Sequence, residues 1–293
     1  MSRICILVFL VFTSPVLLGQ SSLEYKLKEG DKFVILQESV QHISQQFSGV
    51  TQEMDNIING KMEFEVAAVM DDHYEVNMKF LDLGMRVTSA EMGDLMVVNA
   101  KEVVEGDIQS RIFNSMLNVP IRLVLAKSGN IIEVTGGDDL ISKMADAAGF
   151  EDVESRLALE TSLRQEFGSE ALSASFMQMT YIYPDSSADQ EGKWTNEYSG
   201  KLSAKNTWSL VSSDQGENQI EGKADIVLVI NDPGTAMVLN GTQSTKITAQ
   251  AGNGFIREMF VEGFSEGVAT TTATGDLEIP TTVASTTTYK LIE

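Results

Sequence analysis

The chain has one cysteine in 293 residues, Cys5. Cys5 lies inside an N-terminal apolar run, residues 4–12, which follows the positive charge of Arg3 as in a secretory signal peptide. A lipid-anchored precursor would carry its cysteine just after such a run, so the position of Cys5 argues against a lipoprotein. A single cysteine excludes an internal disulfide, and the chain beyond the signal has no thiolate metal site and no cysteine nucleophile.

Long hydrophobic runs are missing from the rest of the chain. A membrane-spanning helix needs about 20 mainly apolar residues, and no later segment approaches that length. The N-terminal run predicts a signal peptide over residues 1–19, cleaved after Gly19, with Ser21 and Ser22 as alternative sites. We therefore expect an exported chain that is periplasmic, associated with the outer envelope or secreted, and that folds as one domain over residues 20–293.

Basic residues are scarce, because 21 Lys and Arg stand against 42 Asp and Glu, a formal net charge of −21. Nucleic acid and anionic lipid surfaces are also negative and would repel such a protein, so the charge argues against both as partners. The acids are spread along the chain and form no run of ligands, so we expect no metal site. Solubility is the simpler explanation of the charge.

The chain has two histidines, His42 and His73, and two tryptophans, Trp194 and Trp208. Neither histidine lies in an H-E-x-x-H zinc motif, and neither is expected to act in a catalytic triad. A glycosidase usually needs an aromatic-rich sugar platform beside its paired carboxylates, and two tryptophans do not provide one. We therefore predict no catalytic residues, no cofactor and no enzymatic activity. A hydrolase that uses scattered carboxylates is the least favoured alternative.

Three glycines, Gly129, Gly136 and Gly137, lie where an apolar strand pattern gives way to a helical one. Their spacing fits neither the dinucleotide motif G-x-G-x-x-G nor a P-loop. Asp138 and Asp139 would occupy the place of a phosphate at the helix N-terminus. The sequence therefore predicts a change of architecture, in which Gly129 turns a hairpin and Asp138 or Asp139 caps a helix.

Apolar and polar residues alternate over residues 23–87, the period of half-buried antiparallel strands. The apolar positions of two such strands, joined by a turn at residues 71–73, are Met62, Phe64, Val66 and Met70, then Tyr74, Val76, Met78 and Phe80. Residues 108–116 have the spacing of a short helix ended by Pro120, and residues 121–134 resemble a hairpin.

Between residues 138 and 181 the apolar spacing becomes helical and predicts two or three amphipathic helices. Strand patterns return from residue 194, and alternation over residues 283–291 favours a final strand over a disordered tail. We predict an α+β fold, mainly antiparallel β: a curved sheet or unclosed β-barrel covered by a central helical segment. Its expected parts are a first β half, a helical insert and a second β half, at residues 20–135, 136–183 and 190–293.

Methionine is abundant, with 14 in the chain, and seven of them fall between residues 54 and 96, within the first β half. Met is unbranched and polarizable, so a concave sheet lined with it can adapt to irregular apolar ligands. The alternative is a loosely specified core. If a ligand binds between sheet and helices, the residues predicted to line it are Met62, Phe64, Met70, Tyr74, Met78, Phe80, Phe176 and Met179.

Four segments carry a resemblance to known proteins: "LEYKLKEGDKF" at residues 23–33, "VPIRLVLAKSGNIIEVTGGDDL" at 119–140, "EGKWTNEY" at 191–198 and the closing "TTTYKL". With them, the chain resembles a family of exported bacterial proteins of unknown function, of the kind found in Bacteroidetes. More distantly, the layout looks like the periplasmic lipoprotein carriers, whose helix-covered half-barrels hold acyl chains. That second resemblance is architectural, and fold alone does not establish function.

These observations favour a non-enzymatic exported envelope protein that binds a lipid or another apolar or amphipathic small molecule between sheet and helices. The alternative is a structural or protein-interaction module of the cell envelope, whose helices complete a solid core and leave no room for a ligand.

Overall fold

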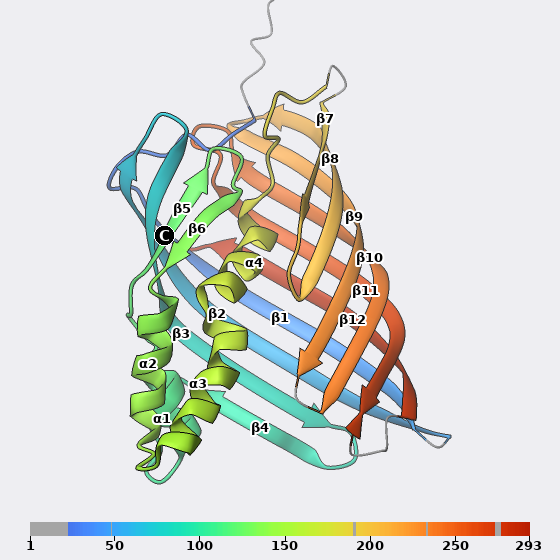
Figure 1. Cartoon of the computed structure of the whole chain (residues 1–293). Helices are drawn as coiled ribbons and strands as arrows, with labels where there is room; N and C mark the ends of the chain where they lie inside the picture. The colour runs from blue at the N-terminus through green and yellow to red at the C-terminus, as the bar shows by residue number, and fades with distance from the viewer. Residues whose placement is uncertain (1–22, 48, 190–191, 233, 273–276) are drawn as a thin grey trace, which may run out of the picture.

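The computed structural model describes residues 23–47, 49–189, 192–232, 234–272 and 277–293 (Figure 1). The predicted signal peptide and its cleavage sites therefore lie outside the described residues. Within the described part, twelve strands form one antiparallel sheet, and the helices cover one side of it. The predicted fold class, an α+β fold built on a curved antiparallel sheet, is confirmed.

The strands are β1 (Lys32–Phe47), β2 (Val50–Val69), β3 (His73–Ser89), β4 (Gly93–Asn99), β5 (Ile121–Ala126), β6 (Ile131–Thr135), β7 (Lys193–Tyr198), β8 (Leu202–Asp214), β9 (Glu217–Asp232), β10 (Thr235–Gln250), β11 (Ile256–Thr271) and β12 (Leu277–Leu291). The helices are α1 (Ile108–Ser115), α2 (Gly137–Ala148), α3 (Val153–Phe167) and α4 (Ser169–Thr180). The threonine-rich end forms β12, as the alternation predicts.

The sheet order is β6-β5-β3-β2-β1-β12-β11-β10-β9-β8-β7, with β4 paired to the far part of β3. The first and second β halves meet where β1 pairs with β12, for example Gln41 opposite Ser285. The sheet rolls so that its two ends approach each other, and α4 lies between β6 and β7 (Figure 1). The amide of Asn196 on β7 donates to the carbonyl of Tyr181 just after α4, at 2.9 Å.

Close approach of neighbouring strands accompanies the roll of the second β half. A Cβ atom on Gly241 of β10 would lie 2.0 Å from the Phe264 carbonyl oxygen of β11. That distance is far below van der Waals contact, so glycine permits an approach that no other residue would. The inward side of the sheet is compressed at this point, as a curved sheet requires.

The start of α2 differs from the prediction that Asp138 or Asp139 caps it. The helix begins at Gly137, Gly136 is its N-cap with φ 95°, and both aspartates lie in the first turn, where the helix dipole favours negative charge. A Cβ on Gly137 would lie 2.6 Å from the backbone nitrogen of Ser169. The packing of α2 against the start of α4 therefore moves the helix start to the glycines.

A hydrophobic core fills the space where the helices meet the sheet. It combines β1, β2, β3 and β5 with α2, α4 and the second β half, and its members include Ile35, Met78, Leu140 and Ile247. Aromatic contacts extend it: the rings of Phe33 and Phe255 stack at 3.8 Å. None of the described helices is both long and apolar enough to cross a bilayer.

Candidate functional site

The concave face of the sheet is the strand face that carries the core. Side chains alternate between the two faces of a strand, and the register identifies which positions share the face of Ile35 and Met62, a directly opposed pair on β1 and β2. Both of these side chains are almost fully buried. We call positions on this face inward and those on the opposite face outward.

Inward positions carry no charge among the described side chains of the twelve strands. Except for Asp232, the last residue of β9, which the pairing with Thr235 gives the inward parity, no inward position of the described strands holds Asp, Glu, Lys, Arg or His, although the chain has 63 Asp, Glu, Lys and Arg residues. The charged strand residues point outward, where they form cross-strand ion pairs such as Lys79–Glu63 at 2.8 Å and Lys32–Glu65 at 3.2 Å.

Burial explains this pattern only in part. Near the helices the inward side chains are buried, and an unpaired charge there would be costly. Farther along the strands, toward the β1–β2 turn, inward residues such as Val283 and Ile279 are still buried, but others, such as Ile43, Met54 and Ile230, are only half-buried. Charged side chains would reach water at such positions, so their absence points to a surface that contacts something uncharged.

A row of carboxamides crosses the inward face between these two regions. The register places its members directly opposite one another from β2 to β7, with Gly263 and Ala224 completing the row. We call this row the amide belt: Asn56, Gln41, Ser285, Gln243, Asn206 and Asn196.

Much of the amide belt is hydrogen-bonded internally. Asn206 donates to the Oδ1 atom of Asn196 at 3.1 Å, and the indole of Trp208 donates to the same atom at 3.0 Å. Asn56 donates to the Oε1 atom of Gln41 at 3.2 Å. The Oδ1 atom of Asn56 is buried and accepts no hydrogen bond from the described residues. An unpaired buried acceptor is uncommon and calls for a partner.

Beyond the belt the inward face is mainly apolar, and we call this region the lower concave face. The row next to the belt contains Met54, Ile43, Val283 and Ile226, with Ser265, Gly241 and Ala204 between and beside them. Four residues farther along, Ile230, Met237, Ala269 and Ile279 oppose one another across β9–β12. The face thus joins uncharged hydrogen-bonding groups to an apolar surface.

Tyrosines on the inward face also remain uncharged. Burial raises the pKa of Tyr289 from its ordinary value of 10.0 to about 12. Burial also raises the pKa of Tyr198, and a hydrogen bond with the Gln243 side chain offsets the rise in part. Both phenols are therefore neutral at physiological pH, so they add no charge to the inward face.

Seven of the residues predicted to line a ligand lie together in the core. Phe64 and Phe176 meet edge to face at 6.1 Å, and Phe80 lies 6.4 Å from Phe176. The Tyr74 hydroxyl donates to the Tyr25 carbonyl at 2.8 Å. The others, Met62, Met78 and Met179, are at most 2% exposed. Here the side chains pack against one another under the helices.

Met70 is not among them, and the prediction that it shares the face of Met62 is wrong. Its exposed fraction is 42%. A bulge between Val66 and Ala68 shifts the alternation, and β2 ends at Val69. A bulge inserts one extra residue, so every later side chain changes face.

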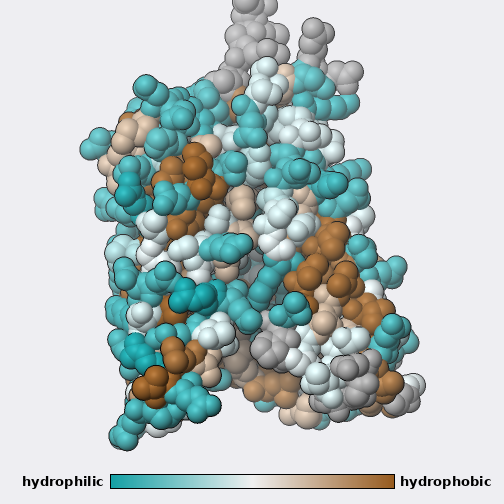
Figure 2. Space-filling model, viewed as in Figure 1, coloured by the Kyte–Doolittle hydropathy of each residue, from teal (hydrophilic) through white to brown (hydrophobic). Residues whose placement is uncertain are grey.

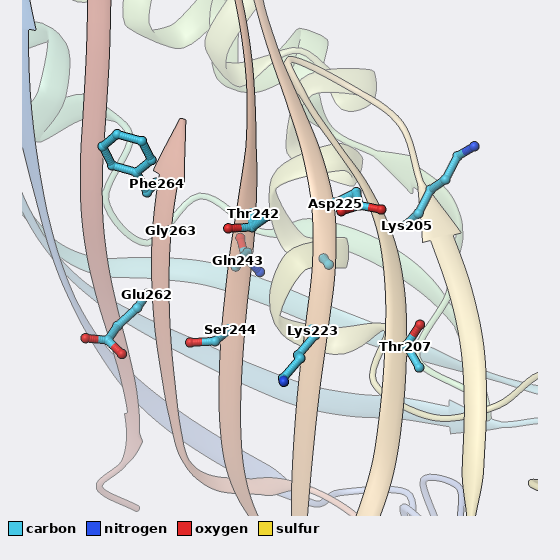
Figure 3. A pocket seen from close by; sticks show the side chains of 11 residues that line it. Lys205, Thr207, Lys223, Asp225, Thr242, Gln243, Ser244, Glu262, Gly263 and Phe264 are labelled. Carbon is cyan, nitrogen blue, oxygen red and sulfur yellow. The ribbon is translucent and has the colours of Figure 1, made fainter. Parts of the chain in front are cut away.

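The outward face holds a shallow groove of about 600 Å³ over β8–β11 (Figure 3). Figure 3 shows Thr242 and its neighbour Gln243 on opposite sides of β10, as alternation requires. The groove mixes Lys205 and Lys223 with Asp225 and Glu262. Acids and bases are matched in number there, so the groove has no distinct charge and offers no particular ligand chemistry.

Hydrophobic surface gathers at the right of the molecule, over β9 and β10 (Figure 2). Exposed apolar side chains on the outward face of these strands include Val227, Val229 and Val238, and the last two are directly opposed. An exposed apolar patch is typical of a surface that contacts another molecule. This patch and the lower concave face lie on opposite sides of the same strands.

No group of His, Asp and Glu among the described residues is placed to hold a metal ion. His42 pairs with Asp55 at 2.5 Å on the outward face, and His73 pairs with Asp72 at 2.7 Å where β3 begins. Trp194 and Trp208 oppose each other on β7 and β8 and are buried. These residues serve packing and surface pairing.

One motif was missed in the sequence: residues 263–267, "GFSEG", have the spacing G-x-S-x-G. A nucleophile elbow is a sharp turn from strand to helix that exposes its serine. Here the five residues run through β11, paired with β10 and β12 on either side, and Ser265 is 4% exposed. The spacing follows from glycines in a curved strand and provides no nucleophile.

Residues 71–256 match the family of unknown function DUF6263, which is more than half of the chain. The chain belongs to DUF6263. The match covers the sheet from β3 to β10 and all four helices. No curated protein matches this DUF6263 chain.

Among solved structures, the DUF6263 fold is similar to lipovitellin, from a study of its lipid–protein interactions. The TM-score is 0.52 at 9% sequence identity, over 92% of this chain and 26% of that chain. The chain thus spans about a quarter of lipovitellin, and the likeness shows the fold alone.

Two further structures match with low TM-scores and carry no argument about this fold. An outer membrane channel from Pseudomonas putida F1 has a TM-score of 0.25 at 8% identity, over 92% of this chain and 98% of that chain. The translocator domain of the autotransporter NalP from Neisseria meningitidis has 0.22 at 8%, over 90% and 89%.

The amide belt and the neutral face of this DUF6263 chain were missed from the sequence, although a signal was present. In "QESVQHISQQF" of β1, glutamines recur at 37, 41 and 45, so they share one face of a strand. The ionisable residues Glu38 and His42 fall on the other face. This separation of neutral polar from charged positions is visible in the parity of the residue numbers alone.

Proposed function

We propose that this protein binds an apolar or amphipathic small molecule on the lower concave face, and that it does so as an exported envelope protein without catalytic activity. The observation that carries the proposal is a concave surface with no charge among its described side chains, in a chain of net charge −21. This surface is half-buried at Ile43, Met54 and Ile230 and buried at Val283, Ile226 and Ile279. Water-exposed protein surface normally carries charged side chains. An apolar ligand would explain why this one does not.

Further support comes from the architecture. Ligand sites are usually concave, mostly apolar and equipped with a few polar groups that fix orientation. The lower concave face with the amide belt has this composition. The fold is also similar to part of lipovitellin, a protein whose structure was described for its lipid–protein interactions. The signal-like N-terminus supports export, and the burial of Ser265 leaves the "GFSEG" spacing without a usable nucleophile.

This location differs from the one that the methionine pattern suggests. The residues under the helices fill their space with one another, so a ligand there would have to displace Met62, Met78 or Phe176 from the core. The solid core and the exposed valines of β9 and β10 favour a second candidate function, a structural or protein-interaction module of the envelope. The two candidates differ in whether the lower concave face binds a small molecule.

The test is the displacement of an apolar fluorescent dye by tetradecanol, for the native protein and two variants. Ile230→Glu places a carboxylate on the lower concave face and is expected to weaken dye binding at least about tenfold, because an unpaired charge must be desolvated. The matched control is Val229→Glu on the neighbouring outward position, which is 39% exposed. It is expected to leave binding unchanged.

Native mass spectrometry of protein purified from its own host complements this experiment and should detect a co-purified apolar molecule. Circular dichroism checks that both variants fold. Dye binding that is absent in the native protein, or weakened equally by both variants, would count against a concave ligand site and leave the structural module as the better candidate.

A further inference from the structure

We propose that the molecule bound on the lower concave face has an uncharged hydrogen-bonding head group, as in a glycerol monoester, and that fatty acid anions and anionic phospholipids are rejected. This inference rests on the proposed function and adds the chemistry of the ligand. It concerns the amide belt, which lies between the packed core and the apolar rows.

The lack of basic groups among the described inward side chains argues against an anionic head group. A carboxylate or phosphate moved out of water needs a cation or it takes up a proton. No inward strand position among the described side chains carries Lys, Arg or His. The lysines nearest to the belt in sequence, such as Lys205 beside Asn206, point outward. An anion would therefore lack a counter-charge, and the net charge of −21 would repel it as it approached.

Cationic head groups meet the same difficulty, because the amide belt and the apolar row beside it include no Asp or Glu. The one inward acid by register in the described strands, Asp232, lies at the far end of β9, eight residues from the belt position Ala224. The buried phenols supply no negative charge, since burial raises the pKa of Tyr198 and of Tyr289. A neutral head group needs no counter-charge when it moves from water to the lower concave face.

The carboxamides of the amide belt indicate that the neutral head group forms hydrogen bonds. A carboxamide offers two N–H donors and an acceptor oxygen without carrying charge. Gln41 and Asn56 face each other on β1 and β2 beside Ser285, and all three are half-buried. The Oδ1 atom of Asn56 still lacks a donor among the described residues, which a ligand hydroxyl would supply. The acyl chain of the same molecule would lie along Ile43, Met54 and Val283, the apolar row next to the belt.

The experiment compares 1-monomyristoylglycerol with myristic acid, which have the same acyl chain, by dye displacement from the full chain over about pH 6 to 9. We expect the affinity for the monoester to be independent of pH. The affinity for the acid is expected to fall about tenfold for each pH unit above its carboxyl pKa, because only the protonated acid can enter. Binding of the acid that equals binding of the monoester at about pH 8 would overturn the inference.

A pair of variants tests the belt directly. Gln41→Lys provides an inward cation and is expected to raise the affinity for myristate at least about tenfold at neutral pH. Val40→Lys adds the same charge on the outward neighbour and is expected to change it little. Equal gains in the affinity for myristate in both variants would show that the amide belt does not discriminate against a charged head group. If Gln41→Lys fails to fold, the pH series on the native protein decides alone.

Failure of the ligand site and failure of the head-group assignment give different results. Absence of binding by both compounds, with no displacement of dye, would refute the ligand site itself. Binding of both compounds with the same strength at every pH would leave the site intact and refute only the neutral head group.

Discussion

Gly241 illustrates at the level of one residue how the sheet is able to curve. We expect Gly241→Ala to lower the free energy of unfolding by about 1–3 kcal/mol, because its Cβ would meet the backbone of β11 and force the strands apart. Urea unfolding followed by circular dichroism measures the change. Gly252→Ala is the control, since no atom lies within 4 Å of its Cβ, and a change below about 0.5 kcal/mol is expected. Equal losses in both variants would disprove the role of close approach.

Single residues also show how far a local pattern predicts burial. The parity of Met62, Phe64, Tyr74 and Met78 predicts their common burial correctly, because alternation is local. Met70 departs from the pattern since a bulge is set by the pairing of β2 with β3, which a single strand pattern does not contain. Tertiary contacts likewise decide the helix start at Gly137, where local capping preference favours the aspartates.

Among the described helices, α3 has the fewest buried residues and takes part in four surface ion pairs. Leu163 is its one buried residue, whereas α2 has six. Arg156 pairs with Asp146 at 2.5 Å and with Glu160 at 3.0 Å, and Arg164 and Glu166 pair with Asp138 and Lys201. Such pairs are weak individually and are screened by salt.

We therefore expect the amides of α3 to exchange hydrogen faster than those of α2, and the difference to grow when NaCl rises to about 1 M. Hydrogen exchange followed by mass spectrometry of the peptides measures it. Peptides from α2 are the internal control: its Asp138 and Asp146 share these ion pairs, but its six buried residues stabilise it by apolar burial, which is insensitive to screening. Exchange in α3 that is slower than in α2, or unaffected by salt, would contradict a role for these ion pairs.

At the scale of the whole molecule, the fold class is predictable from the sequence and the shape of the site is not. Alternation and helical spacing are local signals, and they identify the strands and helices in chain order. The pairing of β1 with β12 joins residues far apart in sequence, such as Ser39 and Thr287, whose hydroxyls lie 2.9 Å apart. This pairing assembles the amide belt from both halves, so the belt becomes visible only when the register is known.

A neutral interior also has a consequence for the stability of the whole molecule at high pH. Burial raises the pKa of Tyr25, Tyr183, Tyr198 and Tyr289 above the ordinary value of 10.0, and that of Tyr289 to about 12. The folded state binds these protons more tightly than the unfolded state. Their contribution to stability is therefore complete below about pH 10 and is lost as the pH rises through the folded values.

We expect unfolding and phenolate formation to coincide in an alkaline titration, with both transitions above about pH 10. Far-ultraviolet circular dichroism measures unfolding, and absorbance at about 295 nm measures phenolate formation. In Tyr289→Phe one proton fewer is released on unfolding, so the midpoint moves to higher pH if the ring still packs. If phenolate absorbance rises with a midpoint at about pH 10 while the sheet remains folded, the buried tyrosines contact water. The interior would then be hydrated, and the neutral apolar surface on which the proposed ligand site depends would not exist.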